Sequence, residues 1–282
     1  MTHRLAVDWG SSRLRVTRVP PAGEPEIRQG DAGAAALIGG GPEGFERALM
    51  ALAGDWIGGC AGIDVAGMAT ARGGWRETPY VSCPADLDAL PDAALHGRIG
   101  NVPLRFLPGL IDPAGPDVMR GEEAQLAALA VEGGGRRTVV LPGTHSKWVR
   151  LDGRTVLGFR TFMTGEIFDL VLRRSLAGRL AKGEAHDDAA FRAGLARGRA
   201  GDAFAALFSA RPAVLTGALR PAGVAAYLSG ACIASEIAQA AAAMGVAAGA
   251  GVTLCGAPAL TGLYRIALEE AGLRVATVAP AG

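Results

Sequence analysis

The stretch RLAVDWGSSRLRVTRV, residues 4–19, joins two alternating apolar runs through a turn of small polar residues. The pattern predicts a strand at Arg4–Asp8, a tight turn through Gly10–Ser12 and a second strand at Leu14–Val19. A glycine in such a turn lets backbone N–H groups approach an anion closely, and two hydroxyls add donors. Asp8, at the end of the first strand, can hold Mg²⁺ through its waters. The same residue types also occur in ordinary hairpin turns.

The second half of the chain contains a matching element, LPGTHSK at residues 141–147. Strands are predicted on either side of it, at Thr138–Leu141 and Lys147–Leu151, and the lysine and histidine bring positive charge to the turn. A surface hairpin with a solvated lysine would have the same sequence pattern. A third element, Leu254–Ala259, runs from a strand into small residues before a helix. Small residues there leave room for a flat ring over the start of the helix, but they also suit any tight turn between a strand and a helix.

Each half therefore opens with a strand–turn–strand unit, and this places a domain boundary near residue 120, giving domains 1–120 and 121–282. Helices are predicted at Gly44–Trp56, Gly121–Val131 and Leu260–Ala271, and through most of the chain between 161 and 244. Further strands are predicted at Ile63–Ala66, Val102–Leu107, Val156–Arg160, Val252–Leu254 and Arg274–Val278. The segment Pro108–Met119 reads as a loop.

The composition limits the class of protein. The 282 residues are 50% hydrophobic and 20% charged, with a net charge of +1, which gives no electrostatic reason to expect nucleic acid or an anionic membrane as partner. Four dispersed cysteines suggest neither a zinc site nor disulfides and suit a reducing compartment. The apolar stretch Gly223–Gly245 includes Glu236 and Gln239, which favours a buried helix over a membrane span. We expect a cytoplasmic protein, and a homo-oligomer is left open.

Competing nucleotide and hydrolase motifs receive little support. The chain has no GxxxxGK[ST] phosphate-binding loop and no GxSxG nucleophile motif. A GxGxxG match exists at Gly39, Gly41 and Gly44, but Pro42 interrupts it. Asp64, the acidic residue that follows, falls inside a predicted strand instead of at its end.

Several runs together resemble the 2-dehydro-3-deoxygalactonokinase family, within the sugar kinase/actin/Hsp70 superfamily. The runs that carry the resemblance are Asp8-Trp9-Gly10-Ser11, Ala66-Gly67-Met68 with Gly74-Trp75, Met119-Arg120-Gly121-Glu122-Glu123-Ala124-Gln125, Pro142-Gly143-Thr144-His145-Ser146-Lys147-Trp148, and Phe159-Arg160-Thr161 with Thr164-Gly165-Glu166. They span almost the whole chain in the expected order.

The resemblance implies an α/β fold of two RNase H-like domains, of the actin/hexokinase type, with a nucleotide and substrate cleft between them. It implies a kinase that uses ATP and Mg²⁺ to phosphorylate 2-dehydro-3-deoxy-D-galactonate, a small sugar acid, to its 6-phosphate in galactonate catabolism. Asp8 would position the metal ion. The residues expected to contact the phosphates or the adenosine are Gly10, Ser11, Ser12, Gly143, Thr144, Lys147, Gly256 and Ala257.

A carboxylate is also needed to orient the attacking hydroxyl and accept its proton. Glu122 and Glu123 open a predicted helix where related folds place a catalytic acid, although the helix dipole alone favours glutamate there. Adjacent carboxylates point in different directions on a helix, so we expect one of them to face the cleft. Glu123 is favoured slightly, because superfamily relatives often place the acid two residues after the glycine.

The predicted substrate carries a carboxylate, which calls for a cationic site. Arg120, beside the proposed base, is the first candidate, followed by Arg13, Arg72 and Arg160. A single arginine is more often a solvated surface residue. Trp75 could pack on the sugar chain, although a lone tryptophan is as often part of a core.

Three further polar residues complete the set, with His145 expected to hydrogen-bond within its hairpin and Thr164 and Glu166 expected at the cleft without an assigned role. The alternatives are a related phosphotransferase or exopolyphosphatase, and a non-catalytic nucleotide-binding regulator on the same scaffold.

Overall fold

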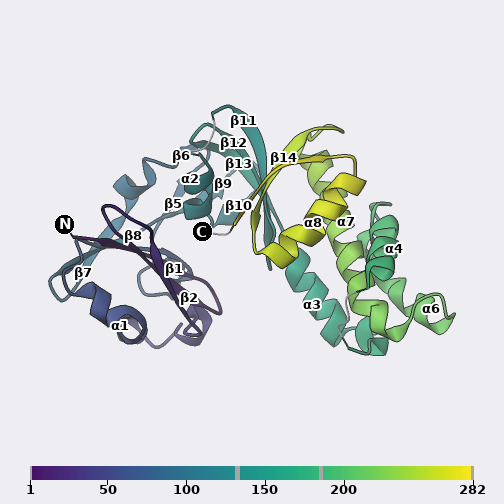
Figure 1. Cartoon of the computed structure of the whole chain (residues 1–282), viewed down its shortest axis with the longest axis horizontal. Helices are drawn as coiled ribbons and strands as arrows, with labels where there is room; N and C mark the ends of the chain where they lie inside the picture. The colour runs from purple at the N-terminus through teal and green to yellow at the C-terminus, as the bar shows by residue number, and fades with distance from the viewer. Residues whose placement is uncertain (1, 131–133, 184–186, 281–282) are drawn as a thin grey trace. The chain divides into compact units, whose positions relative to one another are not determined.

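The computed structural model describes residues 2–130, 134–183 and 187–280 (Figure 1). It divides the chain into two compact units. The first unit comprises Met1–Gly134 and Gly153–Gly158, and the second comprises Gly135–Asp152 and Phe159–Gly282. The division after residue 134, instead of the boundary predicted at 120, leaves the helix that follows Gly121 in the first unit, where Gly121 packs against Gly67.

The first unit is built on a six-stranded sheet in the order β3-β2-β1-β4-β8-β7. The predicted hairpin is present as antiparallel strands β1 and β2, and β4 runs parallel to β1. The strands are β1 (Arg4–Trp9), β2 (Leu14–Val19), β3 (Glu26–Gly30), β4 (Ile63–Gly67), β7 (Leu95–Ile99) and β8 (Val102–Phe106). The helices of this unit are α1 (Pro42–Ile57) and α2 (Glu123–Ala130), with short 3-10 turns at Ala34–Ala36, Met68–Thr70 and Leu90–Ala93.

The segment predicted as a loop at Pro108–Met119 instead contains two short strands. β9 (Gly109–Asp112) and β10 (Asp117–Met119) form an antiparallel pair, and β5 (Tyr80–Ser82) joins β9 as a third, parallel strand. Pro113, Gly115 and Pro116 occupy the connection between these two strands, which is why the local sequence favoured a loop. A further strand, β6 (Ala85–Asp86), pairs with Thr155 and Val156.

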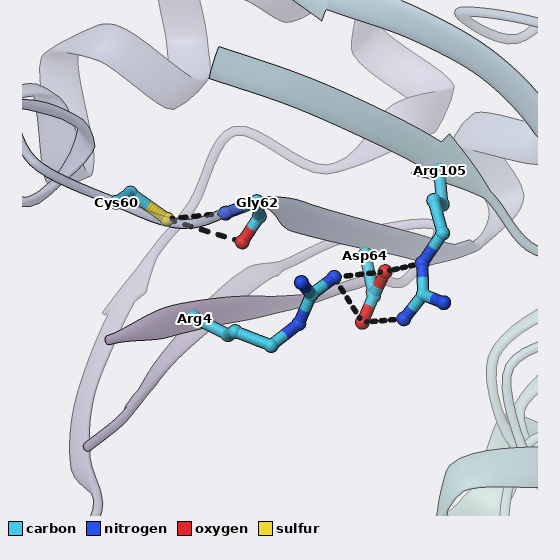
Figure 2. A network of polar contacts seen from close by, with 5 residues as sticks. All are labelled: Arg4, Cys60, Gly62, Asp64 and Arg105. Carbon is cyan, nitrogen blue, oxygen red and sulfur yellow. Dashed lines mark hydrogen bonds and ion pairs between the residues drawn. The ribbon is translucent and has the colours of Figure 1, made fainter. Parts of the chain in front are cut away.

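A carboxylate flanked by two arginines links three neighbouring strands of this sheet (Figure 2). Asp64 on β4 accepts from Arg105 Nε and Nη2 on β8, at 2.6 and 2.8 Å, and from Arg4 Nη2 on β1 at 3.2 Å. The bidentate geometry helps fix the relative position of the strands. Asp64 is therefore part of a structural ion pair within a strand. The interpretation of Gly39, Gly41 and Gly44 as a dinucleotide-binding motif, which needs this acidic residue at a strand end, is wrong.

The second unit repeats the same local topology. Its strands follow the order β15-β14-β11-β12-β13, with β11 and β12 antiparallel and β14 parallel to β11. The strands are β11 (Arg136–Leu141), β12 (Ser146–Asp152), β13 (Thr155–Phe162, shared with the first unit), β14 (Gly251–Gly256) and β15 (Arg274–Pro280). A hairpin beside a parallel strand thus opens both units, and the predicted α/β fold with two such units is confirmed.

The region predicted as helical up to residue 244 contains five α-helices in the described part of the chain: α3 (Thr164–Arg174), α4 (Asp188–Gly198), α5 (Ala203–Phe208), α6 (Ala210–Leu215) and α7 (Val224–Met244). The C-terminal helix is α8 (Pro258–Glu270), and 3-10 turns occur at Gly178–Leu180 and Pro221–Gly223. The apolar stretch that contains α7 is long enough to cross a membrane, but 72% of its apolar window is buried inside the protein. It runs between α8 and α4 as a core helix (Figure 1).

Glycines bring α4 and α7 into backbone contact. A Cβ added at Gly194 would lie 2.0 Å from the carbonyl oxygen of Tyr227, and one added at Gly230 would lie 2.2 Å from that of Phe191. Because backbone atoms cannot move aside as a side chain can, each position requires glycine.

We predict that Gly194→Ala lowers the free energy of unfolding by about 1–3 kcal/mol, through overpacking against α7. The matched control is Gly262→Ala on α8, where an added Cβ meets nothing within 4 Å. This control should stabilise the helix by roughly 0.5–1 kcal/mol, because alanine is the better helix former. Urea denaturation of both variants tests the expectation, and equal effects of the two would contradict the packing argument.

Candidate active site

In the first unit, glycines at the strand ends bring the start of a helix with two glutamates close to Asp8. Gly67 ends β4 with a φ of 83°, and a Cβ there would meet the Trp9 carbonyl oxygen at 2.6 Å. Gly121, with a φ of 110°, has its Cβ position 3.3 Å from Gly67 Cα and 3.8 Å from an oxygen of Asp8. This close approach brings the start of α2, and with it Glu122 and Glu123, beside the end of β1.

Burial raises the pKa of two of these carboxyl groups, Glu123 and Asp8. Desolvation, followed by the neighbouring charge of Glu122, raises the pKa of Glu123 to about 7, although hydrogen bonds and Arg120 oppose the shift. One oxygen of Glu123 accepts from the Gly121 N–H at 2.6 Å, and the other is buried without a hydrogen-bond partner. The pKa of Asp8 is also raised, mainly by burial and further by Glu122, and Arg15 opposes this from the facing position on β2.

The turn between β1 and β2 is held against the segment after β3. The carbonyl oxygens of Gly10 and Ser11 accept from the N–H groups of Ala34 and Ala35, both at 3.0 Å. The side chain of Ser12, like that of Ser11, is exposed. The hydroxyls expected to contact phosphates are therefore accessible.

Arg120 contacts hydroxyl and aromatic groups of the first unit. Its Nη1 donates to Thr70 Oγ1 at 2.7 Å and to Thr78 Oγ1 at 2.5 Å, and its Nη2 donates to the Thr78 carbonyl oxygen at 3.1 Å. The guanidinium carbon lies 4.3 Å from the centre of the Tyr80 ring. These contacts fix the guanidinium in one orientation beside the glutamate pair, and its Nε lacks a hydrogen-bond partner.

Two of the other residues proposed for the sugar acid lie elsewhere. Trp75 is only 9% exposed and packs with Trp9, Phe45 and Phe106, so it belongs to the aromatic core of the first unit and not to a substrate surface. Arg72 has a side chain that is 91% exposed and pairs with Glu77.

The other two arginines proposed for the sugar acid are Arg160 and Arg13. Arg160 lies on β13 in the second unit and donates to the carbonyl oxygen of Phe159. Arg13 is exposed at the end of its turn.

In the second unit, the hairpin between β11 and β12 opens onto a pocket of about 670 Å³. Gly143, Thr144 and Ala257 line it, as expected for nucleotide contacts, and Gly256 lies beside Pro142 at its edge. The remaining lining is largely apolar and comes from four helices: Thr164, Gly165 and Phe168 of α3, Phe191 of α4, Ala225, Ala226, Ser229, Cys232 and Ile233 of α7, and Leu260, Leu263 and Tyr264 of α8. Sequence reasoning did not identify most of these helix residues, because they look like ordinary core positions.

Lys147 does not line this pocket. Its side chain is buried, and its Nζ donates to the His145 carbonyl oxygen at 3.1 Å, so it contacts its own hairpin. The His145 ring contacts Glu166 at the start of α3, with 2.5 Å between Nε2 and Oε2. His145 therefore bonds to the adjoining helix instead of within the hairpin, and Glu166 gains a role as its partner.

The carboxylates of the first unit also decide how a cation could bind. Among the described residues, no three ligating side chains converge on one point. Asp8 is a buried carboxylate next to another negative charge, so it would favour a cation held mainly by water and phosphate oxygens, which is how Mg²⁺ binds in phosphotransferases. The residues present therefore fit Mg²⁺ held through Asp8.

Comparison with known proteins identifies the family of this chain. A sequence model of the 2-keto-3-deoxy-galactonokinase family matches residues 8–281. The chain belongs to this family. It is therefore a phosphotransferase with an alcohol group as acceptor, as the sequence resemblance predicted.

Individual relatives are similar along almost their full length. The chain is 40% identical to a probable 2-dehydro-3-deoxygalactonokinase of Rhizobium meliloti (strain 1021), over 97% of this chain and 91% of that protein. It is 35% identical to the 2-dehydro-3-deoxygalactonokinase of Escherichia coli (strain K12), over 99% and 94%. A crystal structure from Sinorhizobium meliloti, described as the same type of kinase, superposes with a TM-score of 0.86 at 38% identity, covering 98% of this chain and 93% of that one.

We predict that Glu123→Gln stabilises this kinase at pH 8 and does so less at pH 5. The raised pKa means that the folded state binds a proton more tightly than the unfolded state does, so stability falls as pH rises from about 4.5 to about 7. A neutral glutamine avoids that loss, which is at most about 3 kcal/mol. Thermal unfolding without nucleotide or metal is the measurement. The exposed Glu24→Gln is the control, and a Glu123→Gln effect that does not change with pH would contradict the assignment.

Proposed function

We propose that this kinase transfers the γ-phosphoryl group of ATP to the 6-hydroxyl of 2-dehydro-3-deoxy-D-galactonate, in the cytoplasm and in galactonate catabolism. The observation that supports the proposal is the approach of Gly121 to Gly67, which places Glu122 and Glu123 near Asp8. Phosphoryl transfer needs a carboxylate to orient the attacking hydroxyl and another to hold a metal ion, and Glu123 and Asp8 are the residues proposed for these roles.

Within the first unit, Glu123 would accept the proton of the attacking hydroxyl. A general base works best when its pKa lies near the working pH, and a pKa of about 7 meets that requirement. Asp8 would hold Mg²⁺, which when bound supplies positive charge against the phosphate oxygens. Gly10, Ser11 and Ser12 would donate hydrogen bonds to the phosphates.

Within the second unit, Gly143 and Thr144 would contact the phosphates from their hairpin. Gly256 and Ala257 would lie beside the adenosine, in the apolar pocket that the hairpin adjoins. The apolar walls suit a purine ring, because they remove a flat aromatic surface from water.

Arg120 is the residue proposed to bind the carboxylate of the sugar acid. Its Nη1 donates to two threonine hydroxyls and its Nη2 donates to the Thr78 carbonyl oxygen, which leaves the buried Nε–H and the second N–H of Nη2 for a bidentate contact. Its contact with Tyr80 fixes the plane of the guanidinium in advance, which lowers the entropic cost of that contact.

The alternatives are a different phosphotransferase of the same superfamily, an exopolyphosphatase or a non-catalytic regulator. Family membership and the convergent carboxylates favour the kinase. A coupled assay for ADP release with ATP, Mg²⁺ and 2-dehydro-3-deoxy-D-galactonate, beside its gluconate epimer, tests the substrate. Phosphate release from polyphosphate, with no turnover of either sugar acid, would favour the exopolyphosphatase.

We predict that Asp8→Asn lowers kcat at least 100-fold in this assay and leaves the thermal unfolding midpoint within a few degrees of the wild type. Loss of the charge removes the proposed metal contact, whereas the side chain keeps its size. Asp31→Asn, at an exposed position of the same unit, is the control and should retain full turnover. Turnover near the wild-type value in Asp8→Asn would exclude the proposed metal role.

We predict that Arg120→Lys raises the KM for the sugar acid at least tenfold and changes the KM for ATP by less than about twofold. Lysine keeps the charge but cannot form the bidentate contact. Arg72→Lys, at an exposed position, is the matched control. Equal changes in both KM values for Arg120→Lys would indicate that the arginine only maintains the structure of its unit.

A further inference from the structure

A second buried carboxylate lies in the second unit, beneath the hairpin proposed to bind phosphate. Glu236 is only 3% exposed and lies in the middle of α7, among apolar residues. Burial raises its pKa, and several hydrogen bonds oppose that shift. A carboxylate in such a position destabilises the fold unless its oxygens are well satisfied, so its partners indicate what it does.

Its partners come from separate elements around the pocket. Glu236 Oε1 accepts from the Trp148 indole N–H on β12 at 2.7 Å, and Oε2 accepts from the Tyr264 hydroxyl on α8 at 2.5 Å. The hydroxyl of Thr164, the first residue of α3, also hydrogen-bonds to it. One side chain thus joins α3, α8 and β12 to α7.

The chain of hydrogen bonds continues to the hairpin. Tyr264 donates its single hydroxyl hydrogen to Glu236, and Ser146 Oγ lies 2.8 Å from Tyr264 Oη and also hydrogen-bonds to Glu236. The hydroxyl hydrogen of Ser146 therefore goes to Tyr264 or to Glu236, and its oxygen accepts from the Gly143 N–H, at 3.4 Å. Every donor in this series points toward the carboxylate, and the far end is the backbone of a residue that lines the pocket.

The outer side of the same hairpin is held by α3. The Glu166 N–H donates to the Thr144 carbonyl oxygen at 3.0 Å, beside the His145–Glu166 contact. A Cβ at Gly165 would lie 2.6 Å from the Gly143 carbonyl oxygen, so the helix and the hairpin touch through their backbones. The hairpin is therefore held both by the hydrogen bonds that lead to Glu236 and by the contacts with α3.

We propose that Glu236 is a positioning residue for nucleotide binding: through Tyr264 and Ser146 it fixes the Pro142–Lys147 hairpin in the shape that receives the phosphates. The proposal rests on the proposed function, in which Gly143 and Thr144 contact ATP. It assigns to Glu236 no contact with the substrate or the nucleotide. Replacing a carboxylate that only stabilised the core would leave the buried Trp148 and Tyr264 donors unpaired and lower the stability, but it would not change the affinity for the nucleotide.

Two variants interrupt the series while keeping the packing. Tyr264→Phe removes one hydroxyl from a residue that lines the pocket, and Ser146→Ala removes one from a fully buried residue outside the pocket lining. We expect both to raise the KM for ATP about tenfold and to lower kcat, with the KM for the sugar acid changed less than about twofold.

The matched control is Tyr227→Phe, also in the second unit. Its hydroxyl makes the same kind of contact with a serine, at 2.7 Å from Ser209 Oγ, and the residue does not line the pocket. It should lower the unfolding midpoint about as much as Tyr264→Phe and leave both KM values unchanged. If Tyr227→Phe raised the KM for ATP as much as Ser146→Ala does, the effect would be general destabilisation and the proposal would be overturned.

Replacement of the carboxylate itself provides a rescue test. Glu236→Gln can still accept from Trp148 and donate to Tyr264, so the series stays connected and we expect a KM for ATP within about threefold of the wild type. Glu236→Leu breaks it, and we expect at least the effect of Ser146→Ala. If the glutamine and leucine variants have the same KM for ATP, the proposal is wrong.

Amide hydrogen exchange in the free protein separates this proposal from the proposed function. Ser146→Ala should speed exchange in a peptide covering Gly143–Lys147, relative to the wild type. Unchanged exchange together with an unchanged KM for ATP would overturn the positioning role. Faster exchange with an unchanged KM for ATP would show that this hairpin does not bind the phosphates. That outcome would overturn the assignment of Gly143 and Thr144 to ATP, and with it the claimed effect of Glu236 on nucleotide affinity.

Discussion

Close backbone approach at Gly67 and Gly121 is the constraint on which the proposed catalytic site of the first unit depends. Neither position could carry a side chain without displacing backbone atoms, and both have a positive φ that other residues rarely adopt. Because the two segments touch there, the start of α2 lies at the end of β1. Burial of the Glu123 carboxyl, and after it the neighbouring charge of Glu122, raises the pKa of Glu123 to about 7.

In the second unit, too, a close backbone contact and a buried carboxylate lie beside the hairpin. Gly165 lies against the backbone of Gly143, and a buried carboxylate at Glu236 lies on the inner side of the same hairpin. Buried carboxylates lower the stability of the folded state, and a chain selected for stability alone would favour apolar residues at these positions. Their presence in both units, next to the turns that open each one, indicates that local stability has been given up for a defined arrangement of polar groups.

The sequence predicted what local patterns can encode. Both hairpins, the parallel strands beside them and the buried helix α7 follow from alternation, turn residues and apolar length, so these were predicted within a few residues. The pair β9 and β10 was missed because its strands are short and lie among prolines and glycines, where only pairing with each other and with β5 makes them strands.

Side-chain placement was harder to predict, for a different physical reason. Trp75 and Lys147 have the right residue types for a site, but one fills an aromatic core and the other is buried with its amine on its own hairpin. The apolar walls of the pocket beside the second hairpin come from four helices, and their residues are indistinguishable from core residues before the helices are packed. A local pattern predicts which residues could act, whereas packing decides which of them reach a common surface.

Packing favours Glu123 over Glu122 as the proposed base, a choice that the sequence leaves open. Glu122 directly precedes α2 and Glu123 begins it, but Glu123 is buried, has one oxygen without a partner and has a pKa of about 7. Arg120 lowers that pKa in the free enzyme. If the carboxylate of the sugar acid binds to Arg120 as proposed, it would offset this positive charge and so raise the proton affinity of Glu123. The base would then become stronger when the substrate is bound, and weaker when the site holds no hydroxyl to deprotonate.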